Sequence, residues 1–127
     1  MCNNSCCECP RKIFSTSVGV VTIDDVNTLV IGIPEQTFNN CHRGCIVIIQ
    51  NIPTTATINT PVVINIGGGT ETYPAVDKYG NPITVCSLRT RVRYPFIVNT
   101  ANGGIFKILR NLSCAPNNNS STIPATT

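Results

Sequence analysis

The sequence has no tryptophan, one histidine and few charges, since only 12% of its 127 residues are Asp, Glu, Lys or Arg. That share is about half of the usual one. No segment repeats apolar residues at the i, i+3, i+4, i+7 spacing of an amphipathic helix, so a helical bundle is excluded. The net charge is only +3, and without a long Lys/Arg run it does not indicate a nucleic-acid-binding protein.

A secretory signal and a transmembrane run are also lacking. The first ten residues read MCNNSCCECP, which contains neither the basic region nor the apolar core of a signal peptide. The longest apolar run, CIVII from Cys45 to Ile49, is far shorter than a transmembrane helix. We therefore expect a protein that is made in a cytosol and has no membrane partner.

Residue types that carry catalysis are scarce and poorly placed. The Gly67–Gly69 run is not followed by the Lys-Ser/Thr pair of a phosphate-binding loop, and no Gly-x-Ser-x-Gly motif occurs. Asp24 and Asp25 are adjacent between two expected strands, where acidic residues typically form a turn. A dyad of His42 with a neighbouring cysteine is not expected, because such partners meet through the fold. We predict no enzyme activity and no cofactor.

What the sequence does contain favours strands. Val, Ile and Thr are abundant, and short β-branched runs are separated by Gly, Pro, Asn and Asp. The clearest run is RTRVRYPFIV from Arg89 to Val98, in which the three arginines at 89, 91 and 93 alternate with Thr90, Val92 and Tyr94. Seven or eight such strands predict an all-β fold, namely an antiparallel β-sandwich of the jelly-roll type.

The composition changes along the chain and predicts three regions. Residues 1–14 form a Cys-rich N-terminal connector arm, residues 15–115 form the β-sandwich body, and residues 116–127 form a flexible polar tail. If residues 1–11 of this arm are extended, they reach about 35–40 Å, at about 3.3–3.6 Å per residue. The arm is therefore long enough to contact a neighbouring subunit.

Eight cysteines are unusual in a chain of this size. They are Cys2, Cys6, Cys7, Cys9, Cys41, Cys45, Cys86 and Cys114. A bond between the adjacent Cys6 and Cys7 would be strained, so at least two cysteines of the arm are expected to find partners outside it. Those partners are zinc, thiols of the same domain, or another copy of the chain. Zinc is disfavoured, because neither cysteine cluster has the paired spacing of a structural zinc site.

The Cys6-Cys7 pair in a short arm, the lack of a secretory signal and the Cys-bearing β-sandwich resemble the endospore appendage (Ena-type) pilus subunits of spore-forming Firmicutes. In that family the connector of one jelly-roll subunit is disulfide-linked to the bodies of other subunits. The resemblance implies intersubunit links through Cys6 and Cys7. We expect Cys2 or Cys9 to form a further link. The cysteines beside the expected strands are the candidate partners in neighbouring bodies, namely Cys41, Cys45, Cys86 and Cys114. The chain departs from the family in the position of Cys9 and in the polar residues 3–5.

The expected function is that of a structural subunit that joins copies of itself head to tail into disulfide-cross-linked, pilus-like filaments. Its expected place is a spore or cell surface, with an anchoring protein as a further partner. The alternatives are a phage capsid decoration or head-fibre protein on a virion, a Cys-rich spore-coat protein, and a small zinc-binding β module. The arginines from Arg89 to Arg93 are expected to be solvated or to guard a strand edge.

Overall fold

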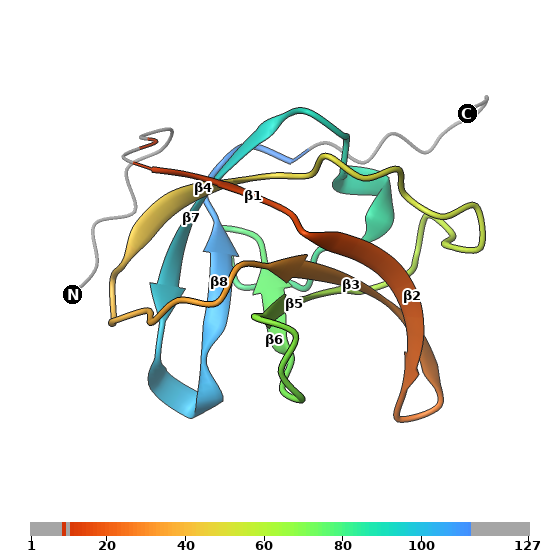
Figure 1. Cartoon of the computed structure of the whole chain (residues 1–127), viewed down its shortest axis with the longest axis horizontal. Coiled ribbons are helices and arrows are strands. Elements are labelled where there is room, and N and C mark those ends of the chain that lie inside the picture. The colour runs from red at the N-terminus through yellow and green to blue at the C-terminus, as the bar shows by residue number, and fades with distance from the viewer. Residues whose placement is uncertain (1–8, 10, 113–127) are drawn as a thin grey trace.

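The computed structural model describes residue 9 and residues 11–112, which form strands and two short 3-10 helices (Figure 1). The strands are β1 (Lys12–Phe14), β2 (Ser17–Ile23), β3 (Val26–Ile33), β4 (Arg43–Val47), β5 (Val62–Ile66), β6 (Tyr73–Val76), β7 (Arg93–Asn99) and β8 (Ile105–Ile108). The 3-10 helices are η1 (Val85–Ser87) and η2 (Ala101–Gly103). The prediction of an all-β fold with seven or eight strands is confirmed.

The strands form one curled sheet with the order β1-β4-β7-β8-β6-β5-β3-β2. The pairs β1–β4, β3–β5 and β6–β8 are parallel, and the other four are antiparallel. The predicted wholly antiparallel arrangement is therefore corrected to a mixed one. Alternation of side chains along a strand shows which face is buried, but it carries no information on the direction of the neighbouring strand.

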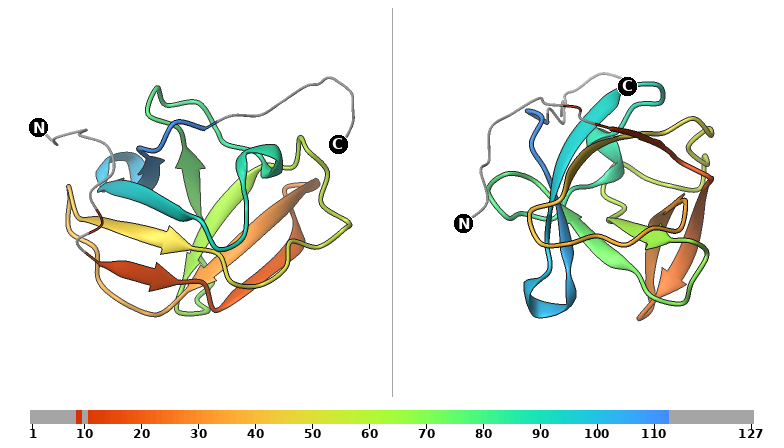
Figure 2. Two further views of the ribbon diagram at one scale, coloured as in Figure 1. Left: turned by 90° about the horizontal axis from the view of Figure 1, so that it is seen from above. Right: turned by 60° about the vertical axis from the view of Figure 1, so that its left-hand side comes forward.

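The two ends of the sheet meet, because β1 and β2 follow each other in the chain (Figure 2). Only Ser15 and Thr16 separate them. The Ser15 N–H donates to the carbonyl of Val47 on β4 at 2.9 Å, and the Thr16 N–H donates to the carbonyl of Gly32 on β3 at 2.8 Å. The segment Ser15–Thr16 thus hydrogen-bonds to strands near both edges of the sheet, and the sheet curls around a single core.

Ser15 holds this bend through buried hydrogen bonds. The residue is only 2% exposed, and its hydroxyl donates to Gln50 Oε1 and accepts from the Ile49 N–H at 2.9 Å. Gln50 Nε2 in turn donates to the Ser15 carbonyl at 3.0 Å. Because every buried polar group here has a partner, the bend does not carry the cost of an unpaired polar group.

The core lies inside the curl and is rich in branched and aromatic side chains. Its largest fully buried members are Phe96, Phe106, Leu29, Ile33, Ile48, Ile64 and Leu109. The Phe96 and Phe106 ring centroids are 5.3 Å apart, and Phe38 meets both rings edge-on. Aromatic pairs at such distances stabilise a core beyond the area that they bury.

The predicted strand from Arg89 to Val98 is shorter than expected. β7 begins only at Arg93, and Arg91 lies in a turn with a φ of 63°. Pro95 and Ile97 on one face of β7 are buried, and so are their neighbours on the other face. The strand is therefore covered on both faces. The expected row of three arginines on one strand face is therefore wrong, because a turn places Arg89 and Arg91 outside the strand.

Candidate assembly surface and disulfide sites

One disulfide ties the beginning of the described chain to the sheet. Cys9 is bonded to Cys45 with a Cα–Cα distance of 5.3 Å, a usual separation for a disulfide. Cys45 lies on β4 and is fully buried, and its N–H donates to the Arg11 carbonyl at 2.8 Å. The bond therefore lies where the chain enters β1 beside β4, and it fixes this entry covalently.

Two further cysteines of the described chain are also disulfide-bonded, namely Cys41 and Cys86. Cys41 precedes β4, and its N–H donates to the Val98 carbonyl at 2.8 Å. Cys86 lies in η1, and its N–H donates to the Ile58 carbonyl at 3.2 Å. Of the four described cysteines, none is a free thiol.

The structure places only part of the predicted cysteine set. It brings Cys9 and Cys45 together within one chain, whereas Cys2, Cys6, Cys7 and Cys114 lie outside the described residues. No local signal could have paired Cys9 with Cys45, because 36 positions separate them and the parallel β1–β4 pairing brings them together.

Part of the predicted connector arm belongs to the sheet. Residues 12–14 form β1, and Ile13 is only 4% exposed. Ile13 pairs with Ile46 on β4 and joins the hydrophobic core. A three-residue strand is too short to show a period in the sequence, which is why sequence reasoning placed it in the arm.

Residues 9 and 11–112 contain no group of three or more His, Cys, Asp or Glu side chains that could hold a metal ion. In the Cys-x₃-Cys segment both sulfurs are engaged in disulfides, so neither Cys41 nor Cys45 is a thiolate ligand. In the same part of the chain, no helix has the length and apolar character needed to cross a membrane.

The most conspicuous surface feature is the free edge of β2. This strand is the last of the sheet and pairs with β3 from Ser17–Gly32 to Ile23–Val26. No strand within the described residues pairs with its other side. Its sequence SVGVVTI contains neither a charge nor a proline, and Val21 is 51% exposed. An uncharged edge of seven residues is a template for pairing with another chain.

The hairpin turn determines which backbone groups face this free edge. Asp24 and Asp25 form the two-residue loop, with φ values of 51° and 67°, as in a type I′ turn. Their predicted role as turn formers is confirmed. In such a hairpin the hydrogen-bonded pairs alternate from the turn onward, so Val18, Val20 and Thr22 direct their N–H and C=O groups outward.

The other edge strand of the sheet, β1, is better protected from pairing with a second chain. β1 has only three residues, and the exposed Arg11 and Lys12 lie at its beginning. Short length and positive charge are two features that protect an edge strand from unwanted pairing. The contrast singles out β2 as the edge that is open to a partner.

Comparison of the chain with protein-family models, curated proteins and solved structures finds no match.

Proposed function

We propose that this protein is a disulfide-stabilised structural subunit that assembles with copies of itself into a pilus-like filament on a spore or cell surface. The observation that carries the proposal is the uncharged, unpaired edge of β2. An added strand gains main-chain hydrogen bonds along such an edge, and the exposed side chains adjust the fit. The occupant of the edge is a strand from a second copy.

The geometry of this contact limits what it can build. If β2 pairs with β2 of a second copy, the contact is two-fold symmetric and closes as a dimer. A filament needs a second, different contact, and the predicted cross-links from Cys6 and Cys7 supply it in this proposal. Strand pairing then sets the register, and disulfides make the assembly permanent.

The disulfide content favours a protein that works in an oxidising compartment. Cys9, Cys41, Cys45 and Cys86 are all bonded, and such bonds persist outside the reducing cytosol. A low charge content also suits subunits that pack closely, because few like charges repel across the contact.

Charging the β2 edge tests the proposal. Gly19 and Val21 share the face of β2 opposite to Val18 and Val20, which pack on the core, and a side chain at Gly19 would meet nothing within 4 Å. Gly19→Lys/Val21→Lys should therefore keep the fold but place like charges side by side in the contact. We expect the wild type to form large species in sedimentation velocity and filaments in electron microscopy, and the double-lysine variant to form smaller, disulfide-linked species and no filaments.

The matched control is Gly19→Thr/Val21→Thr, which adds polar side chains that favour strands but carry no charge. It should assemble like the wild type. A wild type that stays monomeric at all concentrations, or a double-lysine variant that assembles equally well, would overturn the role of the β2 edge.

A further inference from the structure

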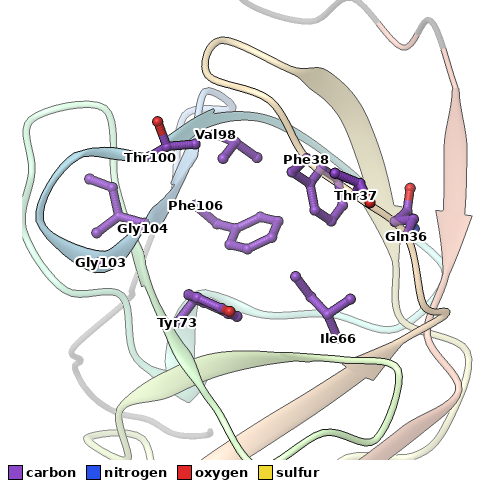
Figure 3. Close-up of a pocket in the computed structure, with 11 residues that line it drawn as sticks. Gln36, Thr37, Phe38, Ile66, Tyr73, Val98, Thr100, Gly103, Gly104 and Phe106 are labelled. Atoms are coloured by element: carbon purple, nitrogen blue, oxygen red, sulfur yellow. The ribbon is translucent and has the colours of Figure 1, made fainter.

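A pocket of about 380 Å³ opens beside the β7–β8 hairpin of the curled sheet. Figure 3 shows the Phe106 ring in the middle of its lining, between the rings of Phe38 and Tyr73. The Phe38 and Phe106 ring centroids are 5.3 Å apart and nearly perpendicular, and those of Tyr73 and Phe106 are 6.3 Å apart. No residue of β2 lines this pocket, so the pocket is separate from the proposed assembly surface.

Gly104 helps to shape the aromatic wall. Its φ of 101° lies in the region that favours glycine, and a Cβ atom there would approach Tyr73 Cδ1 to 3.2 Å. The backbone of the β7–β8 hairpin therefore packs directly against the Tyr73 ring. The Tyr73 hydroxyl donates to Glu71 Oε1 at 3.2 Å, which orients the ring from its other end.

The polarity of the lining limits the kind of ligand. No charged side chain of the described chain lines the pocket, and a charged ligand would lose hydration without gaining an ionic partner. Thr37 and Thr100 lie at the exposed rim, where their hydroxyls can exchange hydrogen bonds with a ligand. The pocket exceeds the cavity of about 150 Å³ that holds benzene in an engineered protein, and it falls within the usual range of ligand sites.

We propose that this pocket binds a small, neutral, planar aromatic molecule of about two rings that carries an N–H or hydroxyl group. The ring system lies against the half-buried rings of Phe38 and Tyr73, where edge-to-face and offset contacts are favourable, and the buried Phe106 ring forms the floor beneath it. The polar group of the ligand reaches the rim, where Thr37 and Thr100 provide acceptors and donors.

Indole is a suitable probe, because the protein contains no tryptophan and indole emission can be excited selectively. We expect a saturable change in indole fluorescence with a Kd of about 1 mM or tighter. In NMR spectra, intermolecular NOEs should connect indole to ring protons of Phe38, Tyr73 and Phe106. An absence of saturation, or NOEs to other residues instead, would overturn the proposal.

Two substitutions at Tyr73 sharpen the test. Tyr73→Ala removes one wall and should weaken indole binding by about tenfold, whereas Tyr73→Phe keeps the ring and should bind within about twofold of the wild type. Gly19→Lys/Val21→Lys, remote from the pocket, should bind normally. Equal affinity of Tyr73→Ala and the wild type contradicts the proposal, and if Tyr73→Ala no longer unfolds cooperatively, the NOEs of the wild type decide.

Discussion

At the scale of residues, Tyr94 shows how a buried polar group holds a loop to the sheet. Its side chain is 4% exposed, and its hydroxyl accepts from the Arg89 N–H at 2.6 Å and donates to the Ser87 carbonyl at 3.3 Å. The Arg110 guanidinium lies 5.9 Å from the ring centroid, within the range of a cation–π contact. One phenol thus secures the turn between η1 and β7.

Removing this hydroxyl should destabilise the protein. Tyr94→Phe leaves the Arg89 N–H and the Ser87 carbonyl without their partner, and we expect a loss of about 1–2 kcal/mol in the free energy of unfolding. Urea denaturation at neutral pH with the disulfides intact measures the loss. An unchanged unfolding midpoint would show that water replaces the hydroxyl at no cost.

The same residue makes a prediction about pH. Burial raises the pKa of Tyr94 above its ordinary value of 10.0, against the opposing effects of the Arg89 N–H and the Arg110 and Arg89 charges. The folded state therefore holds the phenolic proton more tightly than the unfolded state. This contribution to stability is complete below pH 10 and is lost as the pH rises through the raised pKa. Urea denaturation from pH 8 to 11 should show a smaller alkaline decrease for Tyr94→Phe than for the wild type.

At the scale of elements, the β2–β3 hairpin depends on a turn made by two aspartates. Asp25 has a φ of 67°, a conformation that Asp tolerates better than most residues but that Gly adopts freely. The hairpin in turn positions β2, the edge that the proposed function needs. The turn therefore links a local backbone preference to the assembly surface.

Substitution of Asp25 should change stability in two opposite directions. Asp25→Gly should raise the free energy of unfolding by about 0.5–1 kcal/mol, and Asp25→Ala should lower it by a similar amount. Both variants remove the same carboxylate, so the difference between them isolates the backbone effect. Thermal and urea unfolding measure it, and equal stability of the two variants would contradict the assigned turn.

The β1–β4 pair depends on the Cys9–Cys45 bond, because β1 contributes only three residues to the sheet. Cys9→Ala/Cys45→Ala removes a cross-link over 36 positions and should lower the free energy of unfolding by about 3–4 kcal/mol. Denaturant unfolding of the oxidised variant and wild type measures this loss. A loss below about 1 kcal/mol would mean that β1 docks without the cross-link.

At the scale of the whole molecule, the curl of the sheet has two consequences. It brings β1 and β2 together at Ser15 and buries one continuous core, and it leaves β2 with an unpaired side. A contact along that side can hold copies together without disturbing the core.

Covalent growth of an assembly is a separate prediction at this scale. Cys6→Ala/Cys7→Ala should weaken assembly and leave the thermal unfolding of the body unchanged, because the proposed links of these residues run between copies. Non-reducing gels should show a covalent ladder for the wild type that collapses to the 13.6 kDa chain on reduction, and a shortened ladder for the variant. An unfolded variant would instead indicate that these cysteines stabilise their own domain.

Local sequence patterns were sufficient to predict several features of this protein. The β-branched runs and the lack of helical periodicity predicted the all-β class, and adjacent aspartates between two such runs predicted the β2–β3 turn. These features depend on neighbours in the chain, since strand preference and turn chemistry are properties of a few consecutive residues.

Other features were decided only by the tertiary structure. The parallel pairings, the union of Cys9 with Cys45, and the aromatic pocket around Phe106 each combine segments that are distant in sequence. Alternation along one strand is the same for either direction of its neighbour, and eight cysteines allow 105 complete pairings within one chain. Which segments meet depends on how the whole sheet curls to bury its core, and no short stretch of sequence carries that information.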